Sequence, residues 1–152
     1  MKSKIIIYFL IFLAVIFLSL AIFYPQTKKS DIKAIKINNW KISIEIAQTP
    51  YAQAKGLSGR EKLAENQGMF FVYQDYQVRD FWMNKMSFPI DVLWIKDSII
   101  IGLEKNIPLT EGGEIKKFKS PLPVNYVLEI KAGSINKNEI KINDKIEFIY
   151  EE

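Results

Sequence analysis

The sequence contains neither cysteine nor histidine, and these two absences exclude several kinds of chemistry. Without cysteine there is no disulfide, no thiolate nucleophile and no cysteine-ligated zinc. Without histidine there is no Ser-His or Cys-His catalysis and no histidine-ligated metal. We therefore expect no bound metal and no cofactor. A lack of cysteine fits either side of a membrane, so it does not assign a compartment.

Arginine is scarce. The 21 basic residues include Arg60 and Arg79, and the others are all lysine. Because arginine offers a planar fork for paired hydrogen bonds and lysine does not, both arginines are candidates for ligand or ion-pair contacts. The 17 acidic residues leave a net charge of +4, to which Lys2 and Lys4 at the N-terminus contribute. Such a mixed surface is not typical of nucleic-acid-binding proteins, so we expect no nucleic-acid partner.

One long apolar run is present, at residues 5–24, and it contains no charged residue. At about 1.5 Å per residue, a helix of this length spans about 30 Å, enough to cross a bilayer. Lys2 and Lys4 precede it, which favours a cytoplasmic N-terminus. We predict a single-pass anchor in the cell membrane lipid, with the rest of the chain outside the cytoplasm. Signal-peptide cleavage near Ala21, giving a secreted protein, is the main alternative, and a buried soluble helix is a third.

The remainder of the chain is predicted to form one domain. Residues 25–34 begin with a polar stretch and are predicted to be a linker. Residues 35–151 are numerous enough to bury a core without disulfides. We therefore expect an anchor or signal segment at residues 1–24, the linker, and a single globular domain.

The domain is rich in the alternation of apolar and polar residues that is typical of strands. Residues 35–46 alternate on both sides of Asn38-Asn39, which predicts a hairpin. Thr49-Pro50 and Gly56 are suited to the start and end of a short helix near residues 50–56, the one helix that we expect in the domain. Residues 104–120 are predicted to be a long polar loop. Further strands are predicted at residues 68–73, 78–83, 90–95, 99–103, 124–130, 140–142 and 145–150.

Many short strands at close spacing favour a mainly β domain, sandwich-like or barrel-like. Five motifs follow in order along it: residues 56–60 (GLSGR), 68–73 (GMFFVY), 81–84 (FWMN), 89–95 (PIDVLWI) and 126–133 (YVLEIKAG). Together they resemble the domain of unknown function 192 family, over about residues 42–148. The resemblance implies a compact, mainly β, sandwich-like domain, often behind a signal or anchor segment. It implies no established biochemical activity.

The sequence departs from the family pattern at three places. The Met of the family's first turn is Ser58 here, and its Gly-Asp pair near the end is Asn143-Asp144. The family's Lys-Asn-Thr after Trp-Met reads Asn84-Lys85-Met86 here. Any role that depends on the order of those three residues would therefore not carry over to this chain.

Asp91 is a carboxylate within an apolar predicted strand. Burial of a carboxylate is costly unless the group is paired or points outward. Asp91 is therefore either a structural group, which accepts hydrogen bonds from loop amides or pairs with Arg60 or Arg79, or a group that contacts a ligand or transfers a proton. For each arginine, the corresponding alternatives are a structural ion pair and anion recognition.

Residues 81–84 combine core and surface features. Strand alternation directs Phe81 and Met83 to one face, where they are expected to pack in the core, and Trp82 and Asn84 to the other. An aromatic plane beside an amide would suit a sugar or a peptide. The resulting candidates for ligand binding, which include a lysine of the following loop, are Arg60, Arg79, Trp82, Asn84, Lys85 and Asp91.

Two further features have weaker functional interpretations. Glu129 is expected to be an exposed strand residue or a salt-bridge partner, and a hydrolytic pair with Asp91, or a metal site that also uses Asp80, is less well supported. The run from Lys116 to Lys119 is expected to be a solvated loop, with anionic lipid headgroups as the alternative partner.

These features do not identify a catalytic residue. We predict an extracytoplasmic, membrane-anchored module that binds or associates with the envelope without catalysis. Its ligand would be an envelope glycan, a peptide or a protein. A carboxylate-based hydrolase acting on envelope glycan or peptide and a structural assembly partner are the two alternatives.

Overall fold

The computed structural model describes residue 6 and residues 8–16, 31–109, 112 and 114–150. Ile6 and residues 8–16 are helical, and their side chains are exposed. The predicted anchor at residues 5–24 is described in part, since residues 5, 7 and 17–24 lie outside the described residues. Within the described part of the chain, no helix is both long enough and apolar enough to span a bilayer.

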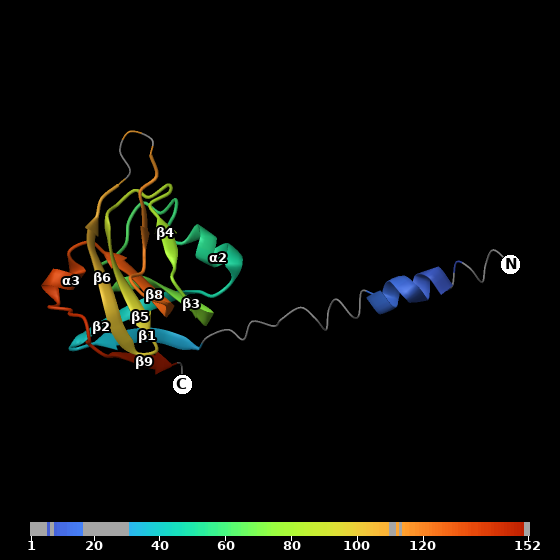
Figure 1. Ribbon diagram of the computed structural model, residues 1–152, viewed down its shortest axis with the longest axis horizontal. Helices are drawn as coiled ribbons and strands as arrows, with labels where there is room; N and C mark the ends of the chain where they lie inside the picture. Colours follow the sequence, from blue (N-terminus) through green and yellow to red (C-terminus); the bar gives the residue numbers. More distant parts are fainter. Residues whose placement is uncertain (1–5, 7, 17–30, 110–111, 113, 151–152) are drawn as a thin grey trace.

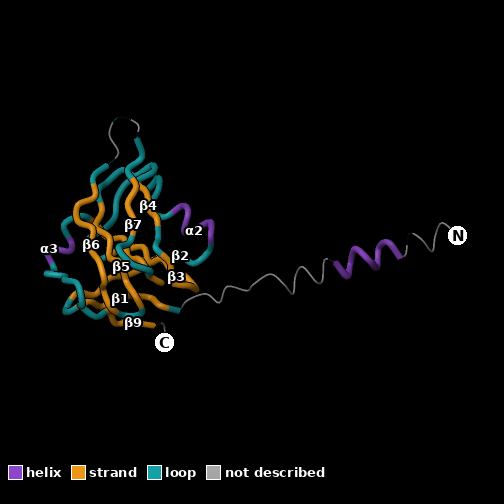
Figure 2. Tube along the Cα trace, viewed as in Figure 1, coloured by secondary structure: helices purple, strands orange, loops and turns teal. Residues whose placement is uncertain are grey.

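From Ile32 onward the chain consists mainly of strands (Figures 1 and 2), which confirms the prediction of a mainly β domain. Two short helices accompany them, α2 (Pro50–Lys55) and α3 (Ser134–Lys137). The strands are β1 (Ile32–Ile37), β2 (Trp40–Ala47), β3 (Gln67–Gln77), β4 (Asp80–Trp82), β5 (Ile90–Lys96), β6 (Ile99–Ile107), β7 (Lys117–Lys119), β8 (Val124–Lys131) and β9 (Ile146–Tyr150).

Seven of the strands form a single curled sheet in the order β6-β5-β8-β3-β2-β1-β9. The first and last strands of this order, β6 and β9, approach each other, and an antiparallel bridge joins Ile99 of β6 to Lys145, which precedes β9. Two backbone hydrogen bonds lie beside it, from Ile100 N to Asp144 O at 3.0 Å and from Asn143 N to Ile100 O at 2.8 Å. The sheet therefore curls until its edges meet, while β4 and β7 form a separate antiparallel pair.

Strands β2 and β3 are parallel, so the chain must cross over between them, and α2 lies in this crossover. The Thr49 side chain accepts a hydrogen bond from Ala52 N at 3.2 Å, which caps the first turn. Gly56 ends the helix with a φ of 50°, in the region that favours glycine. The predicted helix near residues 50–56 is confirmed.

The core has two parts, one on each face of the sheet. The inner cluster, enclosed by the curl, includes Phe70 and Leu93. The outer cluster includes Phe71 and Trp94 and is covered by β4 and β7, whose Phe81 and Phe118 rings lie 5.5 Å and 6.0 Å from the Trp94 ring. Because β5, most of β8 and the first half of β3 are covered on both faces, apolar residues follow one another there instead of alternating with polar ones.

Two predictions for the middle of the chain were wrong in extent. The strand predicted at residues 78–83 is limited to β4, and it belongs to the two-stranded sheet. The loop predicted at residues 104–120 contains the end of β6 and all of β7. β7 reads Lys-Phe-Lys, and its place in a strand depends on tertiary pairing with β4 that the local sequence does not reveal.

Two further predictions near the C-terminus were wrong in kind. Residues 140–142 form loop and turn rather than strand. The sequence Ile-Lys-Ile alternates as a strand does, but Ile140 is buried whereas Ile142 is 53% exposed, so the two isoleucines do not share a buried face. The expectation of one helix in the domain was also wrong, because a second helix, α3, follows Gly133 at a φ of 85°. Its amide at Ile135 is bound by Asp91, a tertiary contact that the local sequence does not reveal.

Candidate functional site

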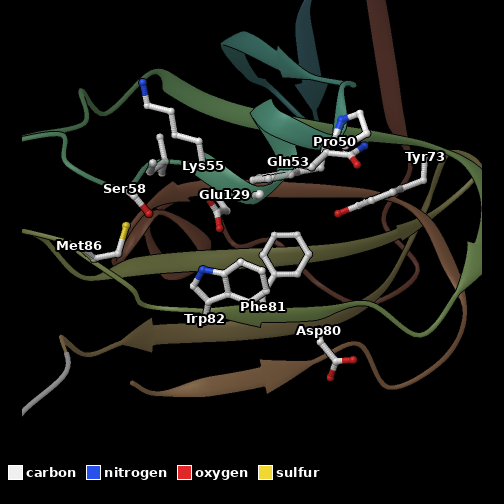
Figure 3. Close-up of a pocket in the computed structure, with 14 residues that line it drawn as sticks. Pro50, Gln53, Lys55, Ser58, Tyr73, Asp80, Phe81, Trp82, Met86 and Glu129 are labelled. Carbon is white, nitrogen blue, oxygen red and sulfur yellow. The ribbon is translucent and has the colours of Figure 1, made fainter. Parts of the chain in front are cut away.

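A cavity of about 250 Å³ lies between α2, the loop that follows α2, and β4, above the outer face of the sheet (Figure 3). Its walls combine polar side chains with apolar ones, among them Leu57, Phe71, Phe81 and Met86. Trp82 also lines the cavity and is 41% exposed. The cavity is thus a pocket lined in part by aromatic side chains, with access to solvent.

Glu129 of β8 provides a carboxyl group to this pocket. Its side chain is buried, with 5% of the residue exposed, and its Oε2 has no hydrogen-bond partner among the described residues. Burial raises the pKa of Glu129 to about 8, against a smaller lowering by the charge of Arg60. The carboxyl group is therefore mostly protonated, and so mostly uncharged, at neutral pH.

Tyr73 of β3 lines the same cavity and is held by Arg79. The guanidinium carbon of Arg79 lies 3.8 Å from the centre of the Tyr73 ring, and its Nη2 pairs with Asp75. Burial raises the pKa of Tyr73 to about 12, while the charge of Arg79 lowers it. The phenol therefore stays protonated at physiological pH and can act as a hydrogen-bond donor.

The local fold explains why Glu129 faces the cavity. In β8, Glu129 pairs with Met69 of β3 and Val92 of β5, and it shares the outer face with Val127. Gly56 passes over it: a Cβ at Gly56 would lie 3.8 Å from Glu129 Oε2. The turn that ends α2 therefore covers the carboxyl group without contributing a side chain of its own.

Hydrogen bonds hold the walls of the cavity in place. Gln53 Nε2 of α2 donates to Val72 O at 2.8 Å, which ties the helix to β3. Ser58 Oγ donates to Asn84 O at 2.7 Å, and Gly59 N donates to Lys85 O at 2.8 Å. The loop after α2 is thus joined to the segment after β4, so the two sides of the mouth form one connected frame.

This domain also matches a known family. The model of DUF192, a domain of unknown function described as an uncharacterized ACR, matches residues 33–148. The chain belongs to the DUF192 family. The resemblance predicted from the five motifs is therefore confirmed. The comparison with curated proteins found no match.

Two solved structures share the DUF192 fold seen here. A candidate transcription regulator from Sinorhizobium meliloti 1021 is 25% identical, with a TM-score of 0.70, over 80% of this chain and 97% of that one. A protein of unknown function from Novosphingobium aromaticivorans DSM 12444 is also 25% identical, with a TM-score of 0.71, over 80% of this chain and 89% of that one. The β domain is therefore the part that these proteins share with our chain.

The DUF192 domain brings together some of the residues predicted to bind a ligand. Trp82 lines the cavity directly. Asn84 and Lys85 are not among the residues that line it, and their carbonyl groups accept hydrogen bonds from Ser58 and Gly59 in the loop after α2. Arg60 lies close enough to influence Glu129, but its Nη2 is paired with Glu45 Oε2 at 2.5 Å. Arg79 contacts the cavity only through Tyr73.

Asp91 lies elsewhere. It pairs with Ile130 in the sheet register and so faces the inner cluster, on the opposite side of the sheet from Glu129. Asp91 is fully buried, and its oxygens accept hydrogen bonds from Asn106 N at 2.7 Å and Ile135 N at 2.8 Å. The structural alternative, a carboxylate that binds loop amides, is the one that this geometry supports. A pair with either arginine is not formed.

Glu129 is the residue whose role the sequence analysis missed. It was expected to be exposed or salt-bridged, yet it is buried and its Oε2 is unpaired among the described residues. The available signal was its position between Leu128 and Ile130, in a run too apolar for a one-sided strand. A hydrolytic pair with Asp91 is not possible across the sheet, and the described residues contain no group of three acidic side chains that could hold a metal.

Proposed function

We propose that this chain is a binding module without catalysis, which holds a small ligand, or one side chain of a larger partner, in the cavity above Glu129. The observation that carries the proposal is the unpaired, buried Oε2 of Glu129 at the side of a solvent-accessible aromatic pocket. An unpaired buried polar atom costs about 1–3 kcal/mol, and a ligand that bonds to it recovers that cost. A pocket with apolar walls and few polar groups is the usual form of a ligand site.

Catalysis by carboxylates is less well supported. Retaining and inverting glycosidases both use two carboxyl groups that face the same substrate. Asp80 also lines the cavity, but Figure 3 shows its carboxylate directed away from Glu129, and Asp91 faces the other side of the sheet. Ser58 has its hydroxyl bonded to a backbone carbonyl. A pocket with one protonated acid suits binding better than hydrolysis.

We place this module outside the cytoplasm, held by residues 5–24 in the membrane. The support is the uncharged apolar run, the preceding Lys2 and Lys4, and the exposed apolar side chains of the described helical residues. An envelope glycan, peptide or protein is then the source of the ligand. Protease added to intact cells should digest the β domain, and protection until the cells are lysed would contradict this placement.

A fragment screen tests the binding function. The full chain in neutral detergent micelles is titrated with neutral, anionic and cationic fragments, and the fluorescence of Trp82 at the cavity is followed with Trp40→Phe in the background to reduce other signals. At least one class should give a saturable change. Ala54 lines the cavity from α2, so Ala54→Phe should fill it and abolish the change.

The matched control is Lys41→Phe, which adds the same ring at an exposed position of β2. It should leave the titration unchanged. The binding function is refuted if no fragment class binds, or if Ala54→Phe and Lys41→Phe bind equally well. A protein that co-purifies with Ala54→Phe as well as with the wild type would instead favour the structural assembly role.

A further inference from the structure

The cavity combines one buried carboxyl group with several aromatic rings. Phe71, Phe81, Tyr73 and Trp82 all line it together with Glu129 (Figure 3). Aromatic faces attract cations, and a carboxylate pairs with them. This combination within one pocket is what a positively charged organic group requires.

We infer that the ligand is an alkyl-ammonium group, either the end of a lysine side chain on a polypeptide or a free alkylamine, whose nitrogen pairs with Glu129 while its carbon chain lies against the rings. This inference rests on the proposed binding function and specifies the chemistry of the ligand. The volume of about 250 Å³ lies below the range of about 300–1,000 Å³ that drug-sized ligands occupy, and it suits a single chain of a few carbons.

The charge balance of the pocket supports a cation. An empty pocket keeps Glu129 protonated and avoids a bare buried charge. When an ammonium group enters, the carboxyl group releases its proton and the two charges pair, so the filled pocket is neutral as well. An anionic ligand would have no such partner and would oppose ionisation of Glu129.

The other charged and titratable groups near Glu129 leave this pairing open. On α2, Lys55 lines the cavity, but Figure 3 shows its ammonium group directed away from Glu129. In the loop after α2, Arg60 is occupied by Glu45. Tyr73 on β3 stays neutral, and Asp80 on β4 adds a negative charge at the rim.

The inference predicts a distinct dependence on pH. Only the ionised form of Glu129 pairs with an ammonium group, and this form is about 1% of the total two pH units below the pKa. Affinity should therefore rise roughly hundredfold between pH 6 and pH 9 and level off above about pH 8. Near pH 6, binding should release one proton per ligand, whereas near pH 9 it should release almost none.

Matched probes test the charge directly. N-acetyl-lysine methylamide is titrated into the full chain in neutral detergent micelles, alongside N-acetyl-norleucine methylamide, which has the same carbon chain and no ammonium group. Calorimetry in two buffers of different ionisation enthalpy counts the released protons. The lysine compound should bind at least tenfold more tightly than the norleucine compound at pH 8. Pentylamine distinguishes the sources: weaker binding than the lysine compound indicates a polypeptide, and equal binding indicates a free amine.

Variants assign the effect to one residue. Glu129→Gln keeps the shape of the side chain but cannot ionise, so it should lose the preference for lysine over norleucine and the pH dependence together. Glu61→Gln removes an exposed carboxylate and should change neither. Circular dichroism on both variants verifies that they are folded.

The inference is overturned if norleucine binds as tightly as lysine, if affinity for lysine is flat from pH 6 to pH 9, or if Glu129→Gln retains the preference. The fragment screen distinguishes failure of this inference from failure of the proposed binding function. A neutral or anionic fragment that binds the wild type and not Ala54→Phe leaves the binding function standing and removes only the ammonium ligand. If no fragment of any class binds, both fail.

Discussion

Replacing Glu129 by glutamine should remove the loss of stability that this residue causes as the pH rises from about 4.5 to about 8. The folded state keeps the Glu129 proton up to about pH 8, whereas an unfolded glutamate ionises near 4.5. Between these values the folded state binds more protons, so stability falls as pH rises through this window. At about 1.4 kcal/mol per pH unit, the loss is on the order of 5 kcal/mol at most. Water that enters the cavity solvates the carboxylate in part, so we expect about 2–5 kcal/mol.

Urea unfolding of the wild type and of Glu129→Gln at pH 5, 7 and 9 measures this effect, since other titrating groups cancel in the difference. The two proteins should have similar stability at pH 5, and the glutamine variant should be the more stable one at pH 9. Glu61→Gln, at an exposed position, should follow the wild type at each pH. The reasoning fails if wild type and Glu129→Gln remain parallel from pH 5 to pH 9.

Three further changes test the scaffold around the cavity. Asp91→Ala leaves the amides of Asn106 and Ile135 unpaired and should cost about 3 kcal/mol in urea unfolding, while the cavity ligand still binds. A change below about 1 kcal/mol would contradict the structural role. Gly68→Ala places a Cβ 2.9 Å from a backbone carbonyl of β8, so it should cost about 1–3 kcal/mol of unfolding free energy and lower the thermal midpoint. Thr49→Ala removes the cap of α2, should cost about 1 kcal/mol and should speed hydrogen exchange in α2, whereas Thr49→Ser should not.

Much of the fold could be predicted because local chemistry determined it. The Asn38-Asn39 turn joins β1 to β2 as expected, with Asn38 at a φ of 53°, and Thr49 and Gly56 bound α2 as their types suggest. The errors fall where a tertiary contact decides the conformation. β7 needs β4 as its partner, and α3 depends on an amide bound by Asp91 from another strand. The residues next to β7 and α3 in the sequence do not reveal these tertiary contacts.

The candidate site was less accessible to prediction for a related reason. Strand alternation correctly predicted that Phe81 and Met83 are buried and Trp82 is more exposed, because that argument needs only one strand. Whether a carboxylate is buried depends instead on what covers the face of the sheet. Asp91 and Glu129 are both carboxylates in apolar strands, yet one is satisfied by two amides and the other faces a cavity. Their difference arises from α2 and its following loop, which lie over one face.

The meeting of β6 and β9 has a consequence for how this domain can engage other molecules. An open edge strand presents unpaired amide and carbonyl groups, and foreign chains can add to it as an extra strand. Where the two ends of the curled sheet join at Ile99 and Lys145, this route to adventitious association is blocked. At this junction the backbone amide and carbonyl groups are used within the sheet, so recognition there is left to side chains.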